Sequence, residues 1–203
     1  MENIFNNKSF KYFSLNSSET IGGIEKPLNE IIGSGIIPFD IYKDTCYFLL
    51  GFDPSAKRWK VFGGGKEQFD KTSRDIAFRE AVEESCKENS SVCYIPIEDE
   101  IANSMKKGEG VVVPSGNKYG RWFNNYFIRI DLKKWIRKYH ASQVNTANQI
   151  LRNEVSMIKW FSENNIKDLF FNKNQSLGQL HEPLVPLFAS FNLCEKLKKH
   201  FNI

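Results

Sequence analysis

A glycine-rich segment followed by a dense group of acidic residues limits what this chain can be more than any other feature. It reads FGGGKEQFDKTSRDIAFREAVEES and spans residues 62–85. Glu80 lies three and four residues before Glu83 and Glu84, and like charges at these spacings destabilise a helix by about 0.2–0.5 kcal/mol per pair. Glycine lets the backbone approach a ligand closely because it has no Cβ. Glycines beside clustered carboxylates are therefore typical of a site for a hard cation such as Mg²⁺, and the simpler alternative is a solvated acidic face.

A helix is predicted after Thr72, because Thr72 is a suitable N-cap and Asp75, three residues later, completes a capping box. Apolar residues at helical spacing predict its buried stripe: Phe78, Ala81, Val82 and Cys86. The three glutamates and Arg79 are expected towards the other side of this helix, which should end near Asn89. Two common phosphate-binding motifs are absent, since the chain has neither G-K-[ST] at Walker A spacing nor G-x-G-x-x-G.

Strands before and after this helix predict an α+β fold. The β-rich runs are residues 34–42, 45–52, 58–62, 91–97 and 121–130, with a further strand starting at Glu154. Residues 131–140 and 184–201 are predicted helices, and residues 97–120 are predicted to be a long irregular connection. We expect residues 1–30 to form a polar arm or extra element, and residues 31–203 to form a single domain with a C-terminal helix.

Composition narrows the class of protein further. The chain is 41% hydrophobic and 26% charged, as in an ordinary globular protein, and its longest apolar runs are too short to span a bilayer. The N-terminus has no basic segment followed by an apolar one, so we expect a cytoplasmic protein with no membrane partner. The net charge of +4 fits an anionic partner without requiring one.

The four cysteines, Cys46, Cys86, Cys93 and Cys194, are scattered along the chain and form no C-x-x-C pair. The three histidines are far apart, so zinc binding is not expected. Reduced and mostly buried thiols are the expected state of these cysteines.

The acidic segment resembles a known motif, the Nudix box, written G-x5-E-x7-R-E-U-x-E-E-x-G-U, in which U is a bulky apolar residue. REAVEES, residues 79–85, agrees with the R-E-U-x-E-E core at each specified position. The flanking RWKVFGGGKE and the later NEVSMIKWF are similar to strands of the Nudix family, so the resemblance covers about residues 33–161.

The segment departs from the box in two places, one on each side of its core. With Gly65 as its first glycine, Lys71 stands where the box has glutamate; with Gly64, Asp70 fills the acidic position and one extra residue precedes Arg79. We prefer the second register, because Asp70 can then pair with Arg79 and hold the loop against the helix. At the far end, Cys86 and Lys87 replace the glycine and the apolar residue of the box, which removes a helix stop signal and no ligand.

The resemblance implies an α/β/α sandwich with a mixed β-sheet, in which the box helix follows the glycine-rich loop. It also implies hydrolysis of a phosphoanhydride by water with Mg²⁺ or Mn²⁺ as cofactor. Glu80 and Glu84 would be the main metal ligands, with Glu83 and the Gly64 carbonyl completing the set and Arg79 orienting it. Glu154 is the first candidate for the general base, and Glu83 is the second; the alternative for Glu154 is a surface acid at a strand edge.

The candidates for substrate binding are Lys66 for a phosphate, and Arg121 with Trp122 for a stacked base. The predicted substrate is a nucleoside diphosphate linked to another moiety. A second possibility is RNA decapping or diphosphoinositol polyphosphate hydrolysis, for which basic residues at 133, 134, 137 and 138 could hold a polyanion, although a solvated basic face is the commoner reading. A third is a Nudix-like module that binds a nucleotide or a protein without chemistry.

Overall fold

The structure is a computed structural model of the 203-residue chain. It describes the following residues: 11–13, 20–21, 28–86, 95, 100–116, 121–134, 155, 157–171, 179–181, 184–189 and 193–203. Among them, no helix is long and apolar enough to cross a membrane.

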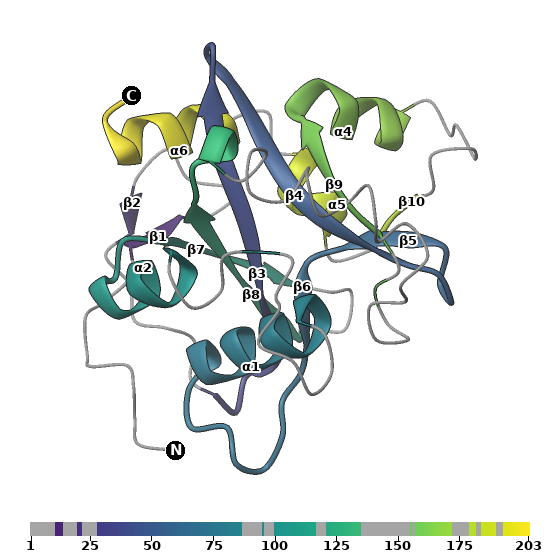
Figure 1. The fold of residues 1–203 in the computed structure, drawn as a ribbon. Coiled ribbons are helices and arrows are strands. Elements are labelled where there is room, and N and C mark those ends of the chain that lie inside the picture. The colour runs from purple at the N-terminus through teal and green to yellow at the C-terminus, as the bar shows by residue number, and fades with distance from the viewer. Residues whose placement is uncertain are drawn as a thin grey trace.

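The described strands form one mixed sheet (Figure 1). They are β1 (Lys11–Phe13), β2 (Thr20–Ile21), β3 (Ile31–Tyr42), β4 (Thr45–Asp53), β5 (Arg58–Lys60), β6 (Phe62–Gly65), β7 (Val111–Gly116), β8 (Trp122–Arg129), β9 (Met157–Ser162) and β10 (Gln179–Leu180). The order is β10-β5-β4-β3-β8-β7-β1-β2, with β6 also paired to β3 and β9 to β4. The pairs β3–β8, β1–β7 and β10–β5 are parallel and the others are antiparallel.

The central strand β3 organises the sheet, because its two halves pair with different partners on one side. Its first half pairs with the glycine strand β6, its second half with β4, and most of its length with β8 on the other side. Lys43 and Asp44 form the two-residue turn to β4, and both have positive φ (47° and 65°), as in the type I′ turn that joins antiparallel strands. The β-rich runs predicted at 34–42 and 45–52 therefore form an antiparallel hairpin.

Helices cover both faces of this sheet. They are α1 (Ser73–Ser85), α2 (Ala102–Lys107), α4 (Glu163–Phe171), α5 (Leu184–Ala189) and α6 (Leu193–Phe201). One hydrophobic cluster joins the sheet to α1 and α2, and another joins the opposite face to α4, α5 and α6. In Figure 1, α1 and α2 lie in the lower part of the view, and α4 and α6 lie in the upper part. The expected α/β/α arrangement, with the box helix after the glycine-rich loop, is confirmed.

The N-terminal end of α1 has the predicted cap. The Thr72 side chain accepts a hydrogen bond from the Asp75 amide (3.2 Å), and the Asp75 carboxylate accepts one from the Thr72 amide (2.8 Å). The helix ends at Ser85, four residues before the predicted end at Asn89, because the backbone of Cys86 is extended. In the expected stripe, Ala81 and Cys86 are buried, and Phe78 and Val82 are half-buried.

Several predicted boundaries are wrong. The segment 97–120 is not irregular throughout, since it contains α2 and β7. The strand expected at 58–62 is two strands, because β5 pairs with β4 and β6 pairs with β3. The C-terminal helix is two described helices, α5 and α6, and neither α4 nor β10 was expected. Of the predicted strand at 91–97 only Ile95 is described, and of the basic helix at 131–140 only residues 131–134 are.

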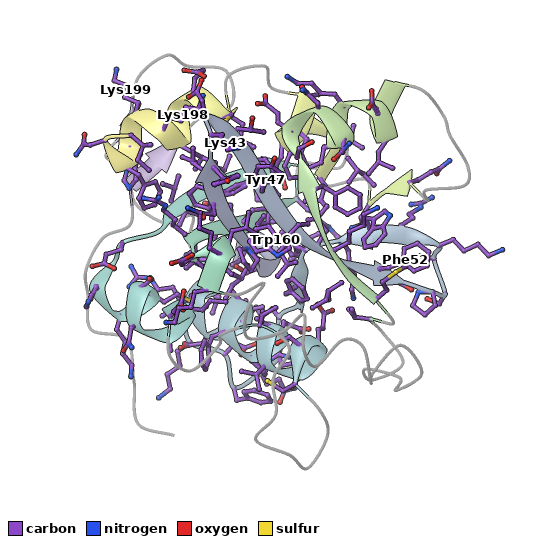
Figure 2. The ribbon with its side chains drawn as sticks, turned by 45° about the horizontal axis from the view of Figure 1, so that its top comes forward. Lys43, Tyr47, Phe52, Trp160, Lys198 and Lys199 are labelled. Carbon is purple, nitrogen blue, oxygen red and sulfur yellow. A yellow bond between two sulfur atoms is a disulfide. The ribbon has the colours of Figure 1, made fainter. Side chains whose placement is uncertain are left out.

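The expectation of reduced cysteines is also wrong. Cys46 on β4 and Cys194 on α6 form a disulfide between residues 148 positions apart, and Cys86 is disulfide-bonded too. Both Cys46 and Cys194 lie in the hydrophobic cluster that α6 covers. An ion pair between Lys198 and Asp44 (2.8 Å) adds a second link from α6 to the β3–β4 turn, and Figure 2 shows Lys198 beside Lys43 of this turn. Spacing in the sequence could not reveal the pairing, since the two cysteines meet only through the tertiary fold.

Candidate active site

The site begins where β3 and β6 approach each other closely. Gly33 pairs with Gly65, and Gly35 pairs with Gly63. A Cβ on Gly35 would lie 2.6 Å from Cγ2 of Val61 and 2.9 Å from the Cα of Gly63, which is closer than real Cβ atoms approach. Glycine is therefore required on both strands, and it lets their backbones approach each other where both strands contact α1.

Gly64 makes room for the carboxylate of Glu80. A Cβ on Gly64 would lie 2.6 Å from Cδ and 2.7 Å from Oε1 of Glu80. The backbone of β6 therefore supports this carboxylate directly, with no side chain between them. Glu80 is mostly buried, with 11% of its side chain exposed.

Arg79 connects the helix acids to the loop. Its Nη1 donates to Oε1 of Glu80 (2.8 Å) and to Oε2 of Glu83 (3.3 Å), and its Nη2 donates to the carbonyl oxygen of Gly65 (2.8 Å). Burial lowers the pKa of Arg79, but its hydrogen bonds with Asp70 and Glu80 outweigh this effect, so the pKa lies above its usual value. Arg79 is thus a fixed positive charge that orients the carboxylates around it.

Asp70 holds Arg79 from the loop side, as the preferred register of the box predicts. Nε and Nη2 of Arg79 donate to the two oxygens of Asp70 at 3.3 and 3.0 Å, a two-pronged contact that restrains both groups. Asp70 also accepts a hydrogen bond from the amide of Glu67 (2.7 Å), which closes the loop. The predicted pairing of Asp70 with Arg79 is confirmed.

Glu84 is the most deeply buried of the three helix acids, and the expectation that it lies on the open side of α1 is wrong. Only 2% of its side chain is exposed; Oε1 forms an ion pair with Nζ of Lys60, and Oε2 accepts a 2.9 Å hydrogen bond from the amide of Gly63. Burial raises the pKa of Glu84 to about 8, although Lys60 and the Gly63 amide act in the opposite direction. Glu80 is buried as well, whereas Glu83 is 41% exposed on its side chain.

Lys60 is the residue of this site that the sequence did not reveal. It ends β5, three residues before Gly63, and its side chain reaches Glu84 on α1. A lysine in a short strand before glycines has no distinctive pattern, and the only available signal was its closeness to the glycine run.

The donors of the site fit a hard cation by their chemistry, because carboxylate oxygens are the ligands that Mg²⁺ and Mn²⁺ prefer. Within the described ranges, however, no three histidine, cysteine, aspartate or glutamate side chains are arranged as a metal cage. Arg79 and Lys60 hold Glu80 and Glu84 instead. The carbonyl oxygen of Gly64 lies beside Gly33 within the strand pairing, so the Gly64 ligand remains a prediction.

The other candidates are less closely joined to the acids. Lys66 is exposed at the loop, where its Nζ donates to the carbonyl of Leu28 (3.4 Å). Arg121 is exposed and Trp122 is half-buried at the start of β8. Glu154 lies outside the described residues, so its role as general base remains a prediction.

A cavity of about 590 Å³ lies at the opposite end of β3, with Asp40, Tyr42 and Arg129 in its wall. Asp40 and Tyr42 follow Gly33 and Gly35 by several positions along the extended strand β3, so this cavity is separate from the acidic cluster.

Comparison with known proteins gives similarity of structure only. No family model matches the chain, and no curated protein matches it in sequence. The solved structures similar to it include the C. elegans Ap4A hydrolase binary complex, at 12% identity and a TM-score of 0.42 over 80% of this chain and 96% of that one. The NUDIX domain of Shewanella oneidensis NrtR complexed with ADP ribose has 14% identity and a TM-score of 0.44 over 83% and 88%. A mutT/nudix family protein from Listeria innocua has 14% identity and a TM-score of 0.45 over 88% and 99%.

Proposed function

We propose that this chain is a metal-dependent phosphoanhydride hydrolase of the Nudix type. The observation that carries the proposal is the burial of Glu80 and Glu84, one helical turn apart, against the glycine strand β6. Burying two like charges opposes folding unless they are compensated, and such clusters occur at functional sites more often than elsewhere. Arg79, Lys60 and the Gly63 amide supply the compensation and hold the carboxylates in place.

Glu80, Glu83 and Glu84 are the residues that would hold Mg²⁺ or Mn²⁺, with the Gly64 carbonyl as a further proposed ligand. Such an ion, when bound, polarises a phosphoryl oxygen and lowers the pKa of a bound water. The protein's own contribution is orientation: Arg79 fixes Glu80, the Gly63 amide fixes Glu84, and Asp70 fixes Arg79. Glu80 and Glu84 would hold such an ion with carboxylate oxygens that also contact Arg79 and Lys60.

The proposed substrate is a nucleoside diphosphate linked to another moiety, hydrolysed at the phosphoanhydride. Lys66 is the proposed phosphate contact, because it is exposed at the end of the glycine strand. Glu154 remains the first proposal for the base that accepts a proton from the attacking water, and Glu83, the most exposed of the helix acids, the second.

Of the basic residues at 133, 134, 137 and 138, only Lys133 and Lys134 are described, and their contacts do not favour the binding of a long polyanion such as RNA. Lys134 pairs with Glu100 (2.7 Å), and Nζ of Lys133 lies 5.1 Å from the ring centre of Tyr42. Both lysines therefore already contact other residues. Tyr42 is the last residue of β3 and lies far from the glycines at the start of that strand. RNA decapping and diphosphoinositol polyphosphate hydrolysis are consequently tested as alternatives and not proposed.

One observation favours a second candidate, a binding module without chemistry. Glu80 and Glu84 are already neutralised by Arg79 and Lys60, and a site of this kind can bind a ligand without any metal ion. A hydrolysis assay separates the two candidates.

The assay measures phosphate and nucleotide release by the purified protein with Mg²⁺, Mn²⁺ or EDTA. The compounds are ADP-ribose, NAD, a diadenosine polyphosphate, nucleoside triphosphates, an inositol pyrophosphate and capped RNA. Glu84→Gln is the site variant, and Glu109→Gln, at an exposed glutamate paired with Lys107, is its matched control. Metal-dependent turnover that only Glu84→Gln abolishes supports the hydrolase; a folded protein without turnover on any compound supports the binding module.

A further inference from the structure

Asn124, on β8, has a buried side-chain amide that makes no hydrogen bond within the described residues. Its exposure is 0%, and neither its amide nitrogen nor its amide oxygen has a hydrogen-bond partner in the part of the chain that the structure describes. The next residue differs in its amide nitrogen: that of Asn125 donates to the carbonyl of Val113 (3.1 Å) and to Oγ of Ser115 (3.0 Å), whereas its amide oxygen is buried without a partner among the described residues. A buried donor and acceptor without partners destabilise a protein, so their presence needs an explanation.

The position of Asn124 places it on the face of the sheet that carries the acidic cluster. Side chains alternate along a strand, and Tyr126, two residues later, packs in the α1 cluster and contacts Ser73 of α1 through its hydroxyl. Ser34 of β3 pairs with both Asn124 and Gly64. Asn124 is therefore two strands from the glycine that supports Glu80, about 10 Å across the sheet.

Trp122 shares this face, because it precedes Asn124 by two residues on the same strand. Gly116 of β7 lies opposite it, and a Cβ there would lie 3.3 Å from Cζ3 of the Trp122 ring. The absence of a side chain at Gly116 thus lets the ring lie across β7. Trp122 is half-buried, and Asn124 lies further along the strand.

An aromatic ring and a buried side-chain amide, two residues apart on one face of a strand, are groups that can together bind a nucleobase. The ring offers a stacking surface, and an amide offers a donor and an acceptor in one plane, which can pair with the edge of a base. Asn124 carries no charge, so it suits a planar polar group better than a phosphate.

We propose that Asn124 reads the edge of the substrate's nucleobase, with Trp122 as the stacking surface. This inference rests on the proposed function, since it places the base at Asn124 and the phosphoanhydride at Glu80, a span that the ribose and the α-phosphate bridge. Because Asn124 is not exposed, a neighbouring side chain must move before a base can reach it. On this face, the neighbour towards the start of β8 is Trp122.

The test is calorimetric titration of the full chain, in EDTA, with AMP, GMP, CMP, UMP and ribose 5-phosphate. We expect one monophosphate to bind at least about tenfold more tightly than ribose 5-phosphate, and Asn124→Leu to weaken it by about 10–100-fold while leaving ribose 5-phosphate unchanged. Asn164→Ala, at an exposed asparagine of α4, is the control and should bind as the unmodified chain does.

A second measurement separates recognition from a purely structural role. Leucine replaces the unpartnered amide by an apolar group of similar size, so Asn124→Leu should melt at the same temperature or higher. If that variant does not fold, Asn124→Asp, which keeps the shape and loses the donor, should change the preference among the four bases. Retention of the original affinities and preference by the folded variants would overturn the inference, as would equal binding of the monophosphates and ribose 5-phosphate.

The two proposals can fail separately. Metal-dependent hydrolysis with no base-dependent binding would overturn the role of Asn124 and leave the hydrolase. Base-dependent binding that requires Asn124, without hydrolysis of any compound in the panel, would support the role of Asn124 and overturn the hydrolase.

Discussion

The backbone amide of Gly63 donates a 2.9 Å hydrogen bond to Oε2 of Glu84, 21 residues later in the chain. The glycine strand β6 therefore binds the carboxylate of Glu84 directly, through a backbone amide. Gly64 has a comparable relationship with Glu80, since its missing Cβ leaves room for that carboxylate. Strand β6 and helix α1 consequently act as one unit, and changes in the strand should affect the acids.

The first prediction uses the two neighbouring glycines. Gly64→Ala places a methyl group 2.6 Å from Cδ of Glu80 and must displace this carboxylate, whereas the nearest atom to a Cβ on Gly65 is 4.0 Å away. We expect Gly64→Ala to lower metal-dependent turnover by about 10–100-fold, because small displacements of catalytic groups have effects of this size. Gly65→Ala should retain activity, and steady-state kinetics on the substrate found in the panel measures both. Equal activity of the two variants would show that Glu80 does not need this position.

The second prediction concerns Arg79. Lysine cannot make the two-pronged contact with Asp70 and also reach Glu80 and the Gly65 carbonyl, so Arg79→Lys should lower the free energy of unfolding by about 1–3 kcal/mol. Urea denaturation measures this change. Asp70→Asn removes the charge and one of the two acceptor oxygens of the partner but leaves the contacts of Arg79 with Glu80 and the Gly65 carbonyl, so it should reduce stability less and leave Glu80 in place. A stability loss for Asp70→Asn as large as that for Arg79→Lys would mean that the Asp70 pair alone accounts for the role of Arg79.

The third prediction is a pH dependence of the metal-free protein. The pKa of Glu84 is raised from 4.5 to about 8, so the folded protein binds a proton that the unfolded chain releases. The stabilisation from this proton is fully present below about pH 4.5 and is lost as the pH rises to about 8. Urea denaturation from pH 5 to 9 should show the unmodified chain losing stability relative to Glu84→Gln over this range. Parallel curves for the two proteins would contradict the raised pKa.

The same shift should appear in metal binding. A divalent cation binds the ionised carboxylate and competes with the proton, so affinity for Mn²⁺ should rise with pH up to about 8 and then level off. Titration calorimetry at several pH values measures the affinity, and Glu84→Gln should bind weakly with little pH dependence. A constant affinity for the unmodified chain over this range would place the ion away from Glu84.

The fourth prediction concerns the disulfide between Cys46 and Cys194. It joins β4 to α6 across 148 residues, and removing a crosslink of this kind lowers stability by about 2–5 kcal/mol. Cys194→Ser together with Cys46→Ser should therefore lower the urea midpoint, and dithiothreitol should have a smaller effect on this variant than on the unmodified chain. Hydrolysis by the folded variant should persist, because the bond lies on the face opposite α1. An unchanged midpoint would show that the apolar contacts of α6 and the ion pair of Lys198 with Asp44 hold the helix without the disulfide.

The sequence determined those features of the protein that depend on nearby residues. The Thr72–Asp75 cap, the turn at Lys43 and Asp44, and the β-rich runs that form β3 and β4 all follow from backbone preferences and side chains within a few positions. The pairing of Asp70 with Arg79 was also predictable, since the two are nine residues apart within one motif. Charge and spacing are sufficient in such cases, because few other partners are within reach.

Only the tertiary structure decided which distant residues meet. The contact of Lys60 with Glu84, the bond between Cys46 and Cys194, and the burial of the Asn124 side chain each depend on how strands and helices far apart in the chain are placed. The strand predicted at 121–130 did not reveal that the Asn124 side chain would be buried without a hydrogen-bond partner among the described residues. Burial of Glu84 reversed the expected position of an acid, because packing of α1 against β6 and its contact with Lys60 outweighed the preference of a carboxylate for water.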